Sequence, residues 1–293
     1  MFTQFFGNYL LNRDLVSPEN LAEALSKQKD TRLKLGVLAI NSGIMTAAQV
    51  DKVHAEQQRV DKRIGDIMVE MGYATREQIE ELFKTQPSGH LLLGQALVDG
   101  GYMTNAQFEQ ALASYKAENG ISEADFYTPG ENSTNKLVNQ FYKFRNDSNV
   151  KYLTGYITLL LKNLVRFIGD DFTPLDAGYI SEKICANCTG QRIEGKLKAV
   201  TIIDADENSA IEFASRFSGE SLSAYDGYTQ ACIGEFLNLH NGLFAVNVSN
   251  EKGEELQLQP QSLYRTLNLS DLANAYIIPM CFSFGTVNFI ISM

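Results

Sequence analysis

A carboxylate and an amide stand one helical turn apart in the segment 225–240, whose apolar spacing predicts a helix. Projected at about 100° per residue, one side is apolar and includes His240, whereas Glu235 and Asn238 fall on the other side. Small residues occupy the middle of that second side, including Gly234, which costs about 1 kcal/mol relative to alanine in a helix interior. Small neighbours let a partner approach closely, so Glu235 and Asn238 form a candidate site. The alternative is a solvated polar edge.

The sequence around this pair is similar to a known family. Glu235-x-x-Asn238, followed by Gly242, resembles the signature of the CheC/CheX/FliY family of chemotaxis phosphatases. A predicted helix before the motif and a late pair of strands add to the likeness, which covers roughly 150–293. It is closest to the CheX branch, whose members carry one active motif. The resemblance implies a CheX-like α+β domain and suggests a homodimer.

The resemblance also implies an activity, the hydrolysis of an aspartyl phosphate on a CheY-like response-regulator receiver. The receiver supplies the magnesium ion and the phosphoryl group, so this chain needs no metal of its own. Asn238 would place a water in line with the phosphorus, and Glu235 would pair with a lysine of the receiver. The alternative from a different class is a non-catalytic adaptor that uses both of its domains as binding surfaces.

A second pattern organises the first hundred residues, where glycine recurs at intervals of 29 residues: Gly7, Gly36, Gly65 and Gly94. Each of the last three copies continues with a glycine and, three residues later, a threonine. A glutamine three residues beyond each threonine completes a predicted capping box, in the pairs Thr46/Gln49, Thr75/Gln78 and Thr104/Gln107. Each unit is therefore predicted to be a short helix, a tight turn and a longer amphipathic helix.

These repeats, over roughly 32–116, resemble the MshEN-type domain, also called the type II secretion ATPase N-terminal domain. Some members of that family bind cyclic di-GMP, and an arginine fork matches the O6 and N7 acceptors of guanine better than lysine does. The alternative use of the fold is as a protein docking surface. Two copies place a cation beside the repeat glycine and are the predicted nucleotide site: Lys34-Leu35-Gly36 and Arg63-Ile64-Gly65.

Composition and element order set the domain plan. We predict an all-α helical-repeat domain over 1–118, a polar linker over 119–135 and an α+β domain with an antiparallel sheet over 136–293, which the resemblance implies is CheX-like. In this last domain the expected elements include helices over 150–168 and 208–217. Its expected strands lie at 196–203, 243–248, 276–284 and 286–292.

The net charge and the apolar segments of the sequence indicate which partners the protein can bind and where in the cell we expect it. The net charge of −10 argues against nucleic acid as a partner, because phosphate binding needs clustered lysine and arginine. The uncharged segment 272–293 reads as two buried strands rather than a membrane span. With no leader pattern at the start, we expect a cytoplasmic protein. The Cys185-x-x-Cys188 pair is either redox-active, half of a zinc site, or two small apolar core residues.

Overall fold

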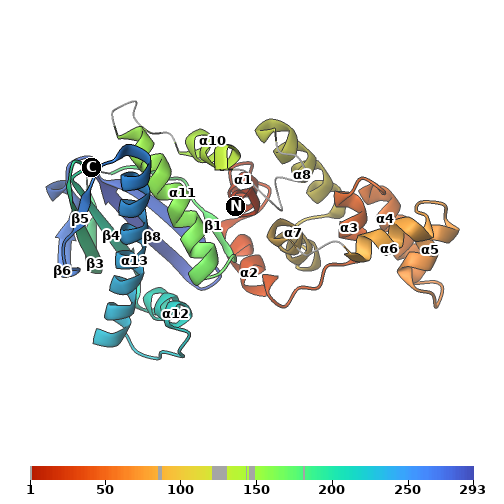
Figure 1. Ribbon diagram of the computed structural model, residues 1–293. Coiled ribbons are helices and arrows are strands. Elements are labelled where there is room, and N and C mark those ends of the chain that lie inside the picture. Colours follow the sequence, from red (N-terminus) through yellow and green to blue (C-terminus); the bar gives the residue numbers. More distant parts are fainter. Residues whose placement is uncertain (1, 85–87, 121–130, 143, 145–148, 181) are drawn as a thin grey trace. The chain divides into compact units, whose positions relative to one another are not determined.

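The computed structural model describes residues 2–84, 88–120, 131–142, 144, 149–180 and 182–293. It divides into two units, Phe2–Pro129 and Gly130–Met293. The described part of the first unit is helical, and the second combines helices with an antiparallel sheet (Figure 1). The predicted α+β class is thereby confirmed.

The N-terminal unit is a series of helix pairs, as the 29-residue period predicts. In its described residues each short helix is followed by a turn and a second helix. The pairs are α1 (Phe2–Leu11) with α2 (Pro18–Gln28), α3 (Leu35–Asn41) with α4 (Ala47–Gln57), α5 (Ile64–Glu70) with α6 (Arg76–Lys84), and α7 (Gly89–Asp99) with α8 (Asn105–Asn119).

The predicted capping boxes are present at the second helix of the last three pairs. In the α8 box, the Gln107 backbone N–H donates to the Thr104 hydroxyl at 3.2 Å, and the Thr104 backbone N–H donates to the Gln107 side chain at 2.9 Å. The same two bonds form at Thr46 and Thr75. The turn before each box contains a left-handed glycine: Gly43, Gly72 and Gly101, with φ of 70°, 71° and 72°.

Three of the four repeat glycines have a packing role. A Cβ added to Gly94 on α7 would lie 2.2 Å from the ring of Phe108 on α8. The short helix of the pair therefore approaches the long helix so closely that only glycine fits. The same contact recurs in two further pairs, at 2.7 Å between Gly36 and Val50 and at 3.3 Å between Gly65 and Ile79.

The C-terminal unit is built on an antiparallel sheet of order β1-β7-β8-β4-β3-β5, with β2 paired to β7 and β6 paired to β3. Its strands are β1 (Phe172–Pro174), β2 (Gly178–Tyr179), β3 (Ile184–Gly195), β4 (Ala199–Ala205), β5 (Leu256–Leu258), β6 (Ser262–Asn268), β7 (Tyr276–Phe282) and β8 (Gly285–Ser292). Its helices are α10 (Glu131–Phe141), α11 (Val150–Phe167), α12 (Glu207–Ser218), α13 (Gly227–Lys252) and the 3-10 turn η1 (Leu269–Asp271).

Helices α12 and α13 pack on the sheet through aromatic rings. Phe213 of α12 lies 5.0 Å from Phe236 of α13 and 6.2 Å from Phe289 of β8, measured between ring centroids. Cys185 and Cys188 of β3 are buried in a separate apolar cluster and form no disulfide. Their burial supports the interpretation as small apolar residues of the core.

The helix that carries the candidate pair is longer than predicted. We expected a helix over 225–240 and a strand over 243–248, whereas α13 runs unbroken from Gly227 to Lys252. Phe244 and Val248 are buried and continue the apolar stripe of the helix, so packing overrides the strand preference of the β-branched residues nearby. Gly253, with φ of 65°, ends the helix.

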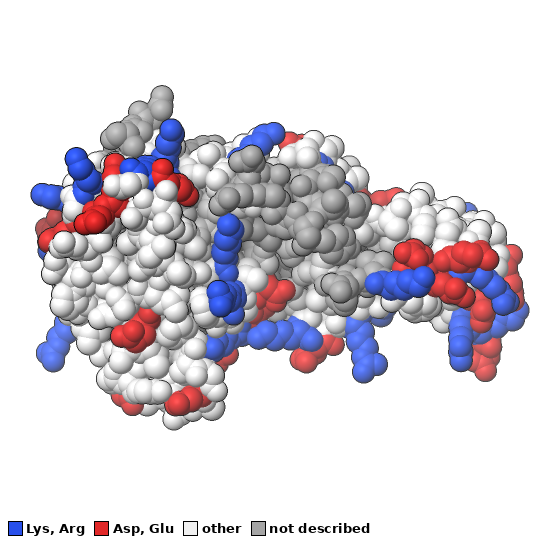
Figure 2. Space-filling model, viewed as in Figure 1, with Lys and Arg blue, Asp and Glu red and all other residues white. Residues whose placement is uncertain are grey.

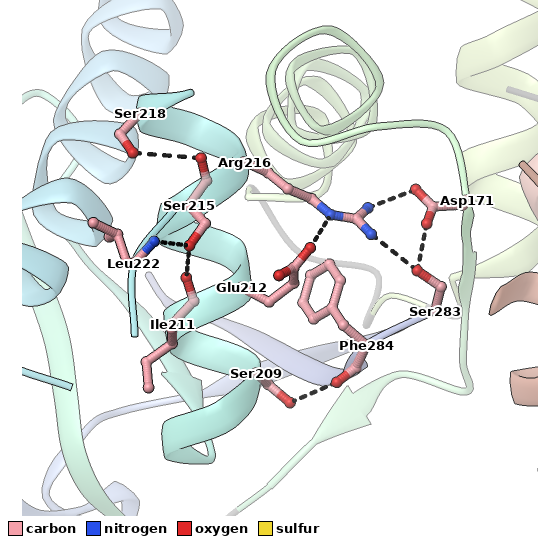
Figure 3. Close-up of polar contacts among 10 residues, drawn as sticks. All are labelled: Asp171, Ser209, Ile211, Glu212, Ser215, Arg216, Ser218, Leu222, Ser283 and Phe284. Carbon is pink, nitrogen blue, oxygen red and sulfur yellow. Dashed lines mark hydrogen bonds and ion pairs between the residues drawn. The ribbon is translucent and has the colours of Figure 1, made fainter. Parts of the chain in front are cut away.

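A buried ion pair fixes α12 against the sheet (Figure 3). The guanidinium of Arg216 reaches across to Asp171 at 2.7 Å and to the Ser283 hydroxyl at 3.0 Å, and its Nε donates to Glu212 at 2.9 Å. It also lies over the ring of Phe284, 4.5 Å from the centroid. Asp171 is 1% exposed, and Arg216 places a positive charge beside its carboxylate, which also accepts a hydrogen bond from the Ser283 hydroxyl.

Candidate functional site

Glu235 and Asn238 lie in the N-terminal half of α13, where the helix start is well defined. The Asp226 carboxylate caps the helix by accepting hydrogen bonds from the backbone N–H groups of Tyr228 and Thr229, both at 3.0 Å. Glu235 is exposed and Asn238 is half-buried. The structure therefore presents the carboxylate and the amide one turn apart on the same helix.

The buried side of α13 is wider than the projection of the sequence indicates. Gly234 was expected on the same side as Glu235, but it is buried, and so is Asn241, two turns beyond Gly234 on the helix. A Cβ at Gly234 would meet Gln261 at 3.6 Å and Thr189 of β3 at 3.7 Å. The sheet and the connection between β5 and β6 therefore cover part of the face that the sequence pattern assigned to the outside.

Asn238 belongs to a polar network between α13 and the sheet. Gln191 of β3 donates from Nε2 to Asn238 Oδ1 at 2.8 Å and to the Gln259 carbonyl at 2.9 Å. Asn241 donates from Nδ2 to Gln191 Oε1 at 2.7 Å and to the Thr201 hydroxyl at 2.8 Å. No sequence pattern indicates Gln191, which lies 47 residues before Asn238 and is brought to it only by strand–helix packing.

Glu235 is held more loosely than Asn238. Its single hydrogen bond among the described residues comes from Gln261 Nε2 at 3.4 Å, and no lysine or arginine in that part of the chain forms an ion pair with it. In Figure 2 the face over α12 and the N-terminal half of α13 is largely uncharged, with isolated acidic side chains. The carboxylate is therefore free to meet a cation of a partner.

His240 lies on the apolar side of α13, as predicted, and cannot reach a partner. It is fully buried, 4.4 Å from the ring of Tyr156, and its Nδ1 lies 3.0 Å from the Asn163 amide nitrogen. Burial lowers the pKa of His240 to about 3, so the ring is neutral at physiological pH. His240 therefore packs in the core and is not part of the candidate site.

The predicted nucleotide residues sit at the starts of two short helices. Lys34 precedes α3, and its ammonium pairs with Asp99 at 2.6 Å, whereas Arg63 precedes α5 and is exposed. A Cβ added to Gly65 would lie 3.5 Å from the Leu35 side chain, so the two repeats are neighbours.

A hollow of about 170 Å³ beside α3 bears on the nucleotide site. Lys34 and Gly36 line it, but Arg63 and Ile64 do not. It is smaller than the roughly 300 Å³ at which ligand pockets usually begin. Binding of cyclic di-GMP stays a prediction.

Comparison with solved structures gives neighbours for about half of the chain. The neighbours of its C-terminal part are CheC-, CheX- and FliY-type chemotaxis proteins. A CheC-like superfamily protein from Shewanella sp. PV-4 is 20% identical with a TM-score of 0.43, and the match covers 49% of this chain and 97% of that one. CheX from Desulfovibrio desulfuricans is 16% identical with a TM-score of 0.42, with 48% and 97% covered.

A third neighbour was solved as a complex, that of CheX with CheY, beryllofluoride and magnesium from Borrelia burgdorferi. It is 18% identical with a TM-score of 0.42, covering 50% of this chain and 98% of that one. Neither a family model nor a curated protein matches the chain by sequence. Within the described residues, every helix is too short or too polar to cross a bilayer.

Proposed function

We propose that the C-terminal unit dephosphorylates the aspartyl phosphate of a CheY-like receiver domain. The observation that carries the proposal is the pairing of a half-buried, hydrogen-bonded amide, Asn238, with an exposed carboxylate, Glu235, one turn away on α13. The spacing of these residues and Gly242 matches the phosphatase signature that the motif resembles. The exposed residue Ala231, one turn before Glu235, leaves room for a partner helix or loop.

Asn238 acts by position rather than as a base. A water held at its amide attacks the phosphorus, and the bond between the phosphorus and the receiver's aspartyl oxygen breaks. The products are inorganic phosphate and the free carboxylate. Phosphoryl transfer depends on alignment and on charge stabilisation. A neutral amide that aligns the water, together with the magnesium ion that the receiver holds, is therefore sufficient to accelerate the reaction.

Glu235 fixes the docking register in this proposal. Its carboxylate pairs with a lysine of the receiver when the two proteins meet. An exposed ion pair contributes only about 0–1 kcal/mol, but exclusion of water in the interface strengthens it. Glu235 therefore contributes chiefly to affinity, whereas Asn238 contributes to the chemical step.

The experiment follows phosphate loss from a receiver. Receiver domains from the same organism are phosphorylated with acetyl phosphate in magnesium and mixed with wild-type protein, with Asn238→Ala, or with Asn247→Ala. Asn247 is an exposed asparagine on the same helix and serves as the matched control. We expect the wild type and Asn247→Ala to accelerate the decay alike and Asn238→Ala to lose most of the acceleration. Decay that is no faster with any of the three proteins than for the receiver alone would instead support a non-catalytic adaptor.

A further inference from the structure

The direction of the Gln191 side-chain amide is set by the main chain. The backbone carbonyl of Gln259 can only accept a hydrogen bond, so the Gln191 atom 2.9 Å from it is the amide nitrogen. The amide oxygen of Gln191 is then the atom that faces the Nδ2 group of Asn241, at 2.7 Å.

A second main-chain carbonyl fixes the same direction from the other end. The Thr201 hydroxyl donates to the backbone carbonyl of Gln191 at 3.2 Å, so its oxygen is left to accept from Asn241 Nδ2 at 2.8 Å. The nitrogen end of Asn241 therefore faces both Thr201 and Gln191. Because Gln191, Thr201 and Asn241 are each 2% exposed or less, water does not compete for these bonds.

The network dictates which end of the Asn238 amide faces outward. One Nε2 hydrogen of Gln191 goes to Gln259, and the other goes to Asn238 Oδ1 at 2.8 Å. The nitrogen of Asn238 is thus turned away from Gln191, and no described residue of the chain accepts a hydrogen bond from it. We infer that Gln191 is a positioning residue, which directs the donor end of the Asn238 amide toward the phosphoryl group of the docked partner.

This inference rests on the proposed phosphatase function and adds a reason for the orientation. The transferring phosphoryl group carries negative charge on its oxygens. An outward N–H group can hold the attacking water through its oxygen or contact a phosphoryl oxygen, whereas an outward carbonyl of Asn238 would repel that charge. A dipole that the fold has already oriented needs no reorganisation during the reaction.

Substitution of Gln191 by glutamate reverses the polarity at this position. An ionised carboxylate only accepts hydrogen bonds, so Asn238 would turn its nitrogen inward and its carbonyl outward. We expect Gln191→Glu to lower the maximal rate of receiver dephosphorylation at least tenfold, while affinity for the beryllofluoride-loaded receiver stays within twofold of the wild type. Gln191→Met, which removes the bonds without imposing the reverse orientation, should lower the rate less.

The pH profile separates this role from a merely structural one. A protonated carboxyl group offers one O–H donor in place of the two N–H donors of the amide, so the rate of Gln191→Glu relative to the wild type should recover in part as the pH falls. No such recovery is expected for Gln191→Met. In the Asn238→Ala background, Gln191→Glu should have no further effect on the rate. A further loss in that background would overturn the positioning role.

The orientation is also measurable without any partner. In ¹⁵N NMR spectra of the full chain, the Gln191 side-chain amide protons should exchange slowly with water and those of Asn238 rapidly. Protected Asn238 protons would overturn the orientation even if the phosphatase assay succeeds. If the wild type does not accelerate decay, the proposed function and the positioning role both fail, and the exchange pattern alone then decides the direction of the hydrogen bonds.

Discussion

Gln261 Nε2 lies 3.4 Å from Glu235 Oε1 and also 3.4 Å from the backbone carbonyl of Gly234. Both bonds are long, and one amide group makes both. The Glu235 carboxylate is thus lightly held at the edge of the sheet, whereas Asn238 is fixed by a 2.8 Å bond to Gln191. Because Glu235 is loosely held and Asn238 is fixed, we expect substitutions at these two motif residues to have different effects.

Neutralising Glu235 should weaken receiver binding and leave the chemical step unchanged. We expect Glu235→Gln to raise the dissociation constant for a beryllofluoride-loaded receiver about tenfold, or about 1.4 kcal/mol, in titration calorimetry. The difference in dissociation constant between Glu235→Gln and the wild type should narrow as salt is added, because salt screens an ion pair. Glu251→Gln, an exposed carboxylate on the same helix, serves as the control. Unchanged affinity for Glu235→Gln would contradict the docking role.

Gly94 should be intolerant of alanine. Gly94→Ala would force a Cβ to 2.2 Å from Phe108, and overpacking of this kind costs about 1–3 kcal/mol. At Gly155 on α11 nothing lies within 4 Å of the added carbon, so Gly155→Ala should stabilise its helix by about 1 kcal/mol. Urea unfolding followed by circular dichroism measures both. Equal effects of the two substitutions would show that the close contact is unimportant.

Some features of the fold can be predicted from a few neighbouring residues, whereas others depend on packing between distant parts of the chain. Threonine and glutamine three residues apart predict the caps at Thr46 and Thr104, because a capping box needs no distant partner. The continuation of α13 beyond His240 was missed, since it depends on what Val248 packs against. Gln191 gave no local signal, because its role exists only once β3 lies beside α13.

Breaking the buried ion pair should destabilise the C-terminal unit. Arg216→Met leaves the Asp171 carboxylate buried without its cation, and losses of this kind are about 3–5 kcal/mol. Arg265→Met, on the exposed face of β6, should change stability by less than about 0.5 kcal/mol. Thermal unfolding of the two variants makes the comparison. A stable Arg216→Met protein would mean that the pair contributes little.

Burial of His240 should make the fold sensitive to acid. Because burial lowers its pKa from 6.5 to about 3, the unfolded chain binds a proton below about pH 6.5 and the folded chain does not. The stability contributed by the neutral ring is thus present above that pH and is lost as the pH falls toward 3, by about 1.4 kcal/mol per unit. His240→Met should reduce the slope of unfolding free energy against pH between 6 and 4. An unchanged slope would contradict this.

In the proposed function, Asn238 serves the chemical step and not the docking of the receiver. The measurement is single-turnover dephosphorylation of a phosphorylated receiver at saturating wild-type or Asn238→Ala protein, with affinity for the beryllofluoride-loaded receiver measured in parallel. We predict that Asn238→Ala lowers the saturated rate on the order of 10²-fold and leaves the affinity within about twofold. Equal saturated rates for the two proteins would contradict it.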